Sequence, residues 1–312
     1  MAYTVQPENI AVALLAGGSS SERSISLASG QSVEKALRAG GFTVTTLDPA
    51  NKADLVTLIE GSFDVAFLAL HGKYGEDGTI QGFLEIAGIP YTGPGVWSSA
   101  TAINKPKTKE LYARANIPTP ACMILNSVDT SAGQVIQEVG LPCVVKAATQ
   151  GSALGVYICQ TQQEVAQAIQ RVFEVDTSAF VEAYIEGEEY TVAVLGTNEP
   201  TVLPVIRIIP QGEFYDFESK YAQGGSQHIC PAPISEADTR KLQGLALAAH
   251  QVLECRGVSR SDFIKDGSGK FWALETNTIP GMTETSLLPD AARAYGVDFV
   301  QLCSSMVYDA LS

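Results

Sequence analysis

Two carboxylates and an amide near the end of the chain are of the types that hold a divalent cation. Residues 257–277 read as a β-hairpin, with strands in "GVSRSDFI" and "FWALETN" around the turn "KDGSGK". Side chains alternate along a strand, so Arg260 and Asp262 share one face of the first strand, and Glu275 and Asn277 share one face of the second. We predict that these four side chains meet on one face of the hairpin.

The register of this hairpin decides whether the two carboxylates are neighbours. A four-residue loop over 266–269 would pair Lys265 with Lys270 and place Asp262 and Glu275 on the same face. Adjacent carboxylates repel each other unless a cation lies between them, and oxygen-only ligands suit Mg²⁺ that is shared with substrate phosphates. The predicted metal ligands are Asp262, Glu275 and Asn277.

A second interpretation needs no metal. Arg260 and Glu275 would then form an ion pair on a hairpin face that is open to solvent. The apolar neighbours Phe263, Ile264 and Trp272 argue against a fully solvated face. The two interpretations therefore differ in how deeply the charged face is buried.

A phosphate-binding loop is predicted at 144–156. The segment "VVKAATQGSALGV" ends a strand with Lys146 and continues into a loop of small residues, whose backbone N–H groups can approach phosphate oxygens closely. The sequence contains no G-x-x-x-x-G-K-[ST] segment, so this loop is not a P-loop. Further along, Glu182 and Glu189 flank a strand end in "VEAYIEGEEYTV", where they could meet an adenine amine and ribose hydroxyls.

Three groups of elements would position these residues. Strands and helices alternate from the run "IAVALLA" onward, which implies a parallel sheet, so residues 1–102 are predicted to form a doubly wound, Rossmann-like domain. Residues 103–190 read as a small α+β subdomain. Residues 191–312 read as a second one, with strands in "EYTVAVLG" and "TVLPVIRIIP", a helix at 235–255 and the hairpin. The predicted fold class is α/β, with a parallel-sheet domain followed by two α+β subdomains.

Composition excludes several classes of protein. The 312 residues carry a net charge of −14 and no Lys/Arg run, which argues against a nucleic-acid partner. Apolar runs are far shorter than the roughly 18 residues that a membrane span needs. Six scattered cysteines without a C-x-x-C pair fit reduced thiols, so we expect a cytoplasmic protein.

Several blocks of the sequence, taken in order, resemble the D-alanine:D-alanine ligases of the ATP-grasp superfamily, and the resemblance covers nearly the whole chain. The blocks are "LAGGSSSERSISLASG" (15–30), "HGKYGEDGTIQG" (71–82), "YTGPGVWSSATAINKPKTK" (91–109), "YDFESKYAQGGSQHICPA" (215–232), "SRSDF" (259–263) and "LETNTIPGMTETSLLP" (274–289).

This resemblance implies an activity. Ligases of the family join two D-alanines into D-alanyl-D-alanine, a cell-wall peptidoglycan precursor, through a D-alanyl phosphate, and release ADP and phosphate. It further implies ATP as a substrate, two Mg²⁺ ions with Mn²⁺ as a possible substitute, and a homodimer. A lid over 216–232 would shield the acyl phosphate from water, and the two α+β subdomains would clamp ATP.

The resemblance also implies a role for each matching residue on the amino-acid side. Glu22 would hold the ammonium of the first D-alanine, and His71 would lie near its carboxylate. Ser152 and Tyr221 would form a hydrogen-bonded link with Glu22 that closes a loop over the site. The remaining assignments are Arg260 and the Gly281 N–H for the oxyanion, and Ser286 and Leu287 for the second carboxylate.

On the nucleotide side the implied roles divide by the part of ATP that is held. Lys105, Lys146 and Lys220 would bind phosphates. The adenosine site would consist of Glu182, the backbone near Ile185, Glu189 and Phe214. Asp262, Glu275 and Asn277 would bind the two Mg²⁺ ions, with Glu275 bridging them.

The sequence departs from the family pattern at three positions near the phosphates. Ala147 follows the phosphate-loop lysine where proline is usual, Ala153 replaces one serine of a pair, and Asn104 stands where an acidic residue is usual. We expect these changes to loosen ATP affinity or to alter loop order without affecting the metal ligands.

Other functions are weighed against the dipeptide ligase. A ligase of the same fold could use D-lactate or D-serine as its second substrate, but enzymes that make the D-lactate ester lack the pair formed here by Lys220 and Tyr221. A nucleotide-dependent dehydrogenase would need G-x-G-x-x-G spacing, which "GGSSSE" does not have. A non-catalytic ATP-binding module would bind nucleotide without releasing phosphate.

Overall fold

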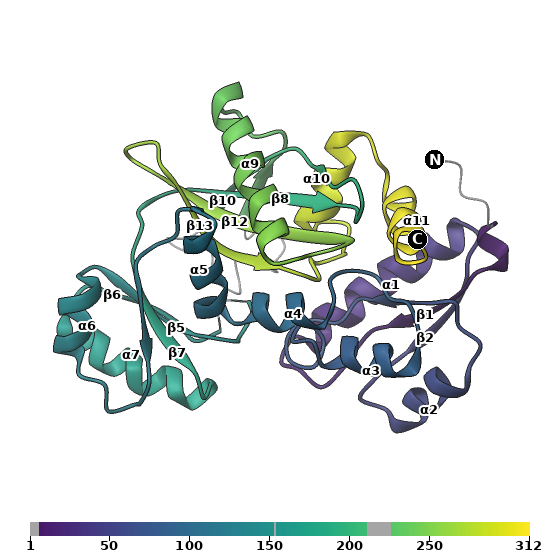
Figure 1. The fold of residues 1–312 in the computed structure, drawn as a ribbon, viewed down its shortest axis with the longest axis horizontal. Coiled ribbons are helices and arrows are strands. Elements are labelled where there is room, and N and C mark those ends of the chain that lie inside the picture. The colour runs from purple at the N-terminus through teal and green to yellow at the C-terminus, as the bar shows by residue number, and fades with distance from the viewer. Residues whose placement is uncertain (1–5, 153, 211–225) are drawn as a thin grey trace.

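The computed structural model describes residues 6–152, 154–210 and 226–312. Its strands form three sheets that follow one another along the chain, and helices cover them (Figure 1). Of the lid predicted over 216–232, residues 216–225 lie outside the described residues. The part from 226 on begins with strand β11 (Ser226–Ile229), which pairs with β10 (Ile206–Pro210) at the edge of a sheet.

The N-terminal sheet is parallel, and two of its three strands are buried on both faces. Its strands are β1 (Ala11–Leu15), β2 (Thr43–Leu47) and β3 (Val65–Leu68), in the order β2-β1-β3. Alternate residues of β1 pack into two different cores, as is typical of parallel strands with helices on both sides. The helices of this part are α1 (Arg23–Ala39), α2 (Lys52–Glu60), α3 (Thr79–Ala87) and α4 (Val96–Ile103).

The C-terminal helix returns to this first sheet. Helix α11 (Phe299–Ala310) lies beside α1, and its Leu302, Cys303 and Met306 share a core with Val12 and Leu14 of β1 (Figure 1). The two ends of the chain are thus joined by one hydrophobic core.

The central sheet is antiparallel, in the order β4-β7-β5-β6. Helices α6 and α7 pack against it through a core of Val, Ile, Ala and Cys side chains. Helix α7 begins with a capping box, in which Thr161 and Glu164 satisfy each other's backbone N–H groups. Between residues 105 and 183, the helices and strands in chain order are α5 (Lys105–Arg114), β4 (Cys122–Leu125), α6 (Ala132–Val139), β5 (Cys143–Ala147), β6 (Val156–Cys159), α7 (Gln162–Val175) and β7 (Ala179–Ala183).

The third sheet has the order β11-β10-β8-β12-β13, with β9 paired to β8. One face packs on α9 and α5, and the other carries the charged residues of the hairpin. The remaining elements are β8 (Gly187–Leu195), β9 (Thr201–Val202), α9 (Glu236–Val252), β12 (Val258–Asp266), β13 (Phe271–Asn277) and α10 (Leu287–Tyr295).

The predicted hairpin register was wrong, although the predicted face was right. Lys265 pairs with Phe271, not with Lys270, and Phe263 pairs with Ala273. A β-bulge follows: Asp262 pairs with Glu275, so Leu274 is an extra residue. Without it, Asp262 would face Leu274, and Glu275 would point into the core with Ala273. The bulge therefore brings the two carboxylates together.

The predicted fold class is confirmed: a parallel-sheet part is followed by two α+β parts. One strand prediction was wrong, because "TVLPVIRIIP" is interrupted between β9 and β10, where Pro204 has no N–H to donate to a ladder. The domain boundaries at 102 and 190 stay predictions. Within the described ranges, no helix has the length and apolar character needed to cross a membrane.

Candidate active site

Two adjoining cavities lie where the three sheets meet. One, of about 790 Å³, is lined by the N-terminal part, the hairpin and the start of α10. The other, of about 380 Å³, lies between the central and third sheets. Both are lined by Lys105, Ser152 and Glu275, so a group held by one cavity can meet a group held by the other at these residues.

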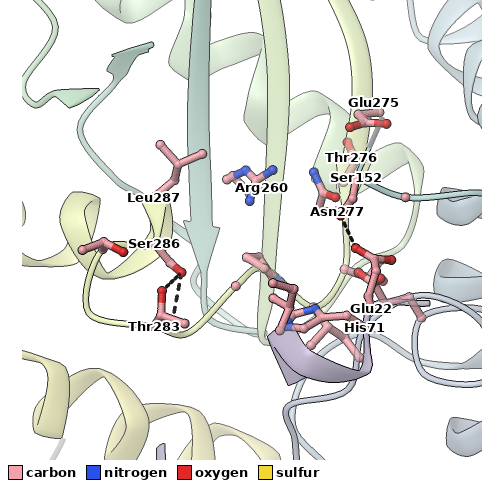
Figure 2. Close-up of a pocket in the computed structure, with 18 of the residues that line it drawn as sticks. Glu22, His71, Ser152, Arg260, Glu275, Thr276, Asn277, Thr283, Ser286 and Leu287 are labelled. Atoms are coloured by element: carbon pink, nitrogen blue, oxygen red, sulfur yellow. Dashed lines mark hydrogen bonds between the residues drawn. The ribbon is translucent and has the colours of Figure 1, made fainter. Parts of the chain in front are cut away.

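Glu22 lies at the floor of the larger cavity, directly before helix α1. It is buried, and the Ser152 hydroxyl donates a hydrogen bond to its carboxylate (Figure 2). Gly72 and Gly151 approach the same carboxylate so closely that a Cβ at either position would lie 2.7 Å from one of its oxygens. A buried carboxylate at the edge of a cavity is suited to hold an ammonium group.

His71 is buried beside Glu22, directly beyond β3. Its Nε2 lies 3.2 Å from the Ser29 hydroxyl. Burial, reinforced by the charge of Arg260, lowers the pKa of His71 to about 4, and a hydrogen bond with the Ile279 backbone only partly opposes this. The imidazole is therefore neutral near pH 7 and can hydrogen-bond a substrate without adding charge.

Arg260 and Asp262 form a bidentate ion pair on the charged hairpin face. The guanidinium Nε and Nη2 lie 3.1 and 3.0 Å from the two carboxylate oxygens, and the Thr191 hydroxyl donates to Asp262 at 2.6 Å. The Asn277 amide donates to the same carboxylate at 3.3 Å. Asp262 thus already holds one cationic group, the guanidinium.

Glu275 faces the border between the cavities and pairs with Lys105, whose Nζ lies 3.4 Å from its Oε2. The side chains of Arg260, Asp262, Lys105 and Glu275 are only 13%, 18%, 13% and 26% exposed. The solvated-face interpretation is therefore wrong: this charged face is mostly buried, and it lines the cavities instead of the outer surface.

The metal interpretation needs more than the protein's carboxylates. Among the described residues, no three His, Cys, Asp or Glu side chains cluster as a metal site. Asp262 and Glu275 are register partners, and Asn277 is the next residue of β13 on the same face. Three oxygen-bearing side chains therefore lie together, and ligand oxygens would have to complete a coordination sphere.

The start of α10 borders the far end of the larger cavity. Ser286 is at the N-cap position, but its side chain caps nothing; its Oγ lies 2.7 Å from the Thr283 hydroxyl and accepts from the Thr283 N–H at 3.0 Å (Figure 2). Gly281 approaches closely, since a Cβ there would lie 3.0 Å from Ser286 Oγ. Leu287 begins the helix, whose N-terminal N–H groups favour an anion such as a carboxylate.

The smaller cavity contains the residues predicted for the nucleotide. Lys146 Nζ lies 2.5 Å from Glu182 Oε1, and Lys109 Nζ lies 2.7 Å from Glu182 Oε2. Burial disfavours the charge of Glu182, but the two lysines outweigh it and lower the pKa of its carboxyl. Ile185 and Glu189 line the same cavity. The apolar lining, including Val144, Ile158, Ile208 and Leu274, suits a flat aromatic ring.

Every predicted site residue that the structure describes lines one of the two cavities. Those of the larger cavity are Glu22, His71, Lys105, Ser152, Arg260, Glu275, Asn277, Gly281, Ser286 and Leu287. Those of the smaller cavity are Lys105, Lys146, Ser152, Glu182, Ile185, Glu189, Asp262 and Glu275. Phe214, Lys220 and Tyr221 lie outside the described residues. The roles of all these residues stay predictions.

Two of the departures from the family pattern have local explanations. The Ala147 N–H donates to the Gly155 carbonyl at 2.9 Å, a bond that proline could not make. Asn104 caps helix α5 by accepting from the Lys107 N–H at 3.2 Å, a task that an aspartate performs equally well. Ala153 is not described.

Sequence reasoning missed Glu76, which lines the larger cavity. The Gly72 N–H donates to its carboxylate at 2.6 Å. Burial, together with the nearby charge of Glu22, raises the pKa of Glu76 to about 8; Lys105 and Arg260 oppose the shift. The only signal in the sequence was the acidic pair in "GEDG" of an already recognised block, which does not reveal burial.

The raised pKa of Glu76 predicts a pH-dependent stability. Without ligands, folded Glu76 keeps its proton up to about pH 8, whereas the unfolded chain releases it near 4.5. The folded state thus binds the extra proton in this window, and the free energy of unfolding falls as pH rises through it. We expect Glu76→Gln, which can still accept from Gly72, to be more stable than wild type by on the order of 1–3 kcal/mol at pH 8.5 and equal at pH 4.

Thermal unfolding of both apoproteins from pH 4 to 8.5 measures this difference. The exposed Glu174, changed to Gln, is the control and should follow wild type at every pH. If the unfolding temperatures of wild type and Glu76→Gln changed with pH in the same way, the pKa of Glu76 would not be raised in the folded protein.

Comparisons with known proteins agree in pointing to one family. Profiles described as "D-ala D-ala ligase C-terminus" and "D-ala D-ala ligase N-terminus" match residues 111–308 and 50–94. A D-alanine–D-alanine ligase of Pelotomaculum thermopropionicum is 43% identical over 304 residues, covering 95% of each chain. One of Alcanivorax borkumensis is 45% identical over 300 residues, covering 96% of this chain and 94% of that one.

Solved structures extend the comparison to three dimensions. The Bacillus anthracis D-alanine–D-alanine ligase complexed with ATP has a TM-score of 0.85 at 31% identity and covers 97% of each chain. The Coxiella burnetii ligase has a TM-score of 0.84 at 26% identity and covers 97% of this chain and 94% of that chain. The similarity therefore spans both cavities.

Proposed function

Because this chain belongs to the D-alanine–D-alanine ligase family, we propose that it joins two D-alanines at the expense of ATP, forming D-alanyl-D-alanine, ADP and phosphate. The observation that carries the proposal is the meeting of two cavities at Lys105, Ser152 and Glu275. A γ-phosphate in the smaller cavity can there reach a carboxylate in the larger one.

The first step transfers the phosphoryl group. Glu22 binds the ammonium of the first D-alanine, and neutral His71 lies near its carboxylate, which attacks the γ-phosphorus and displaces ADP. Lys105 and Lys146 offset the charge that spreads over the phosphate oxygens. Such a transfer depends on positioning and charge neutralisation more than on covalent help from the protein.

The second step forms the peptide bond. The amine of the second D-alanine, whose carboxylate rests on Ser286 and Leu287, attacks the acyl carbon and loses a proton. Arg260 and the Gly281 N–H stabilise the oxyanion until phosphate leaves. Donors placed in advance for a developing negative charge are typically worth roughly 3–4 kcal/mol each.

Divalent cations fit the hairpin face. Asp262 already holds a guanidinium, which stands in for a cation, and Glu275 and Asn277 lie next to it. We assign these three residues to two Mg²⁺ ions, for which Mn²⁺ would substitute. When bound, Mg²⁺ would neutralise the charge of the phosphate oxygens.

The cellular setting follows from the same proposal. The product would supply peptidoglycan synthesis, and its substrates ATP and D-alanine would be met in the cytoplasm. The six cysteines are free, in keeping with a reducing compartment. A homodimer is proposed from family resemblance alone.

A substrate panel tests the proposal. We expect phosphate release from ATP with D-alanine but not with L-alanine, and with D-alanine and D-lactate offered together near neutral pH the dipeptide should be the main product. Mass spectrometry of the products measures this. Ester as the main product would identify a ligase for D-lactate, and nucleotide binding without phosphate release would identify a non-catalytic module.

A further inference from the structure

Lys109 is a buried lysine for which the assignments above provide no role. It lies on helix α5, and its side chain is 2% exposed. It lines neither cavity, so it does not touch the nucleotide or the amino acids. A buried ammonium is costly unless it is paired and hydrogen-bonded, so its surroundings should reveal what it does.

The surroundings of Lys109 hold it firmly in place. Its ammonium donates to the Thr119 hydroxyl at 2.5 Å and to the Pro120 carbonyl at 3.2 Å. The Thr119 hydroxyl in turn donates to the Ala273 carbonyl of β13 at 2.9 Å. Lys109 is thus anchored at the junction of α5, the 117–121 connection and the hairpin.

Glu182 contacts two ammonium groups that differ in exposure. Its side chain is 3% exposed and contacts Lys109 through Oε2 and Lys146 through Oε1. Lys109 Nζ lies 2.7 Å from Oε2, and its charge stabilises the carboxylate there. Lys146 is 17% exposed and lines the nucleotide cavity, whereas Lys109 does not.

The charges of this cluster do not cancel. The three side chains carry two positive charges and one negative charge, and the lysine that faces the nucleotide cavity is Lys146. We propose that Lys109 is a positioning residue for ATP: it remains the counterion of Glu182, so that Lys146 can turn from that carboxylate to the phosphates. This inference rests on the proposed binding of ATP in the smaller cavity.

The variant Lys109→Met would test what Lys109 contributes to ATP binding. In Lys109→Met, Glu182 and Lys146 would form a buried ion pair whose two charges cancel. Phosphates that attract Lys146 would then leave a buried carboxylate without a counterion, which is strongly unfavourable. We expect the Kd of ADP to rise about 10- to 100-fold. Adenosine has no phosphate to attract Lys146, so its Kd should change less than about threefold.

Calorimetric titration of ADP and adenosine into each variant measures these constants. Lys107→Met is the matched control, because Lys107 is an exposed lysine of the same helix whose ion pair is with Glu110. It should bind both ligands like wild type. Equal losses for ADP and adenosine in Lys109→Met would contradict the proposal, since they would indicate a distorted cavity.

A double-mutant cycle tests the proposal even where Lys109→Met folds poorly. In the Glu182→Gln background there is no carboxylate to strand, so adding Lys109→Met should change the Kd of ADP by less than about threefold. An undiminished loss in that background would overturn the role of Lys109. Failure of wild type itself to bind ADP would overturn the proposed function together with this inference.

Discussion

Glu275→Gln is expected to abolish turnover while the protein stays folded. The change removes the negative charge that borders both cavities, pairs with Lys105 and lies across the bulge from Asp262. If the carboxylate bridges cations that neutralise the phosphates, its loss costs several kcal/mol in the transition state, or roughly a thousandfold or more in kcat. Gln has the same shape, so the register of β13 should be kept.

Three measurements separate this effect from damage to the fold. Phosphate release gives kcat, thermal unfolding should give a Tm close to that of wild type, and Mn²⁺ binding in the presence of ADP, followed by electron paramagnetic resonance, should weaken. The exposed Glu174, changed to Gln, controls for the loss of one charge. Turnover near the wild-type rate would exclude Glu275 as a metal ligand.

The hairpin illustrates how far the sequence could predict the site. Period-two alternation correctly placed Arg260 with Asp262 and Glu275 with Asn277, because side-chain direction along a strand is a local property. The register is not local. The bulge at Leu274 lies in a strand that packs on helix α5, where the Tyr112 hydroxyl lies 2.5 Å from the Thr276 hydroxyl, and nothing in "FWALETN" indicates it.

The burial of Lys109 and Glu76 could not be predicted from the sequence for a similar reason, because it too arises from tertiary packing. The resemblance pointed to Glu182 and Lys146, which lie on adjacent strands of one small sheet. It did not point to Lys109, which comes from a helix and is brought to Glu182 only by the packing of α5. Glu76 also looks like an ordinary surface acid in the sequence, because its raised pKa arises from burial and from the charge of Glu22. Residue types, spacing and the family resemblance predicted the chemistry, whereas tertiary packing determines the electrostatics of the buried charges.

Arg260→Met is expected to lower kcat by roughly 10²- to 10³-fold, with little change in the KM of ATP. Arg260 lines the larger cavity and not the smaller one, where we propose that ATP binds, so its loss should affect the proposed oxyanion more than nucleotide binding. Asp262 keeps the hydrogen bond from Thr191, which should hold the carboxylate in place without the guanidinium. Steady-state kinetics with ATP and D-alanine varied separately measures both constants.

A second readout of the same variant reports the electrostatics directly. The guanidinium of Arg260 is one cause of the lowered pKa of His71, so its removal should raise that pKa from about 4, although burial, the larger cause, should keep it below 6.5. NMR titration of the imidazole measures the change, and Arg240→Met, in an exposed ion pair on α9, is the control. An unchanged His71 pKa would mean that Arg260 does not act on the first D-alanine's site through its charge. Lowered kcat with a raised His71 pKa would instead show that one cation acts both on the oxyanion and on the imidazole.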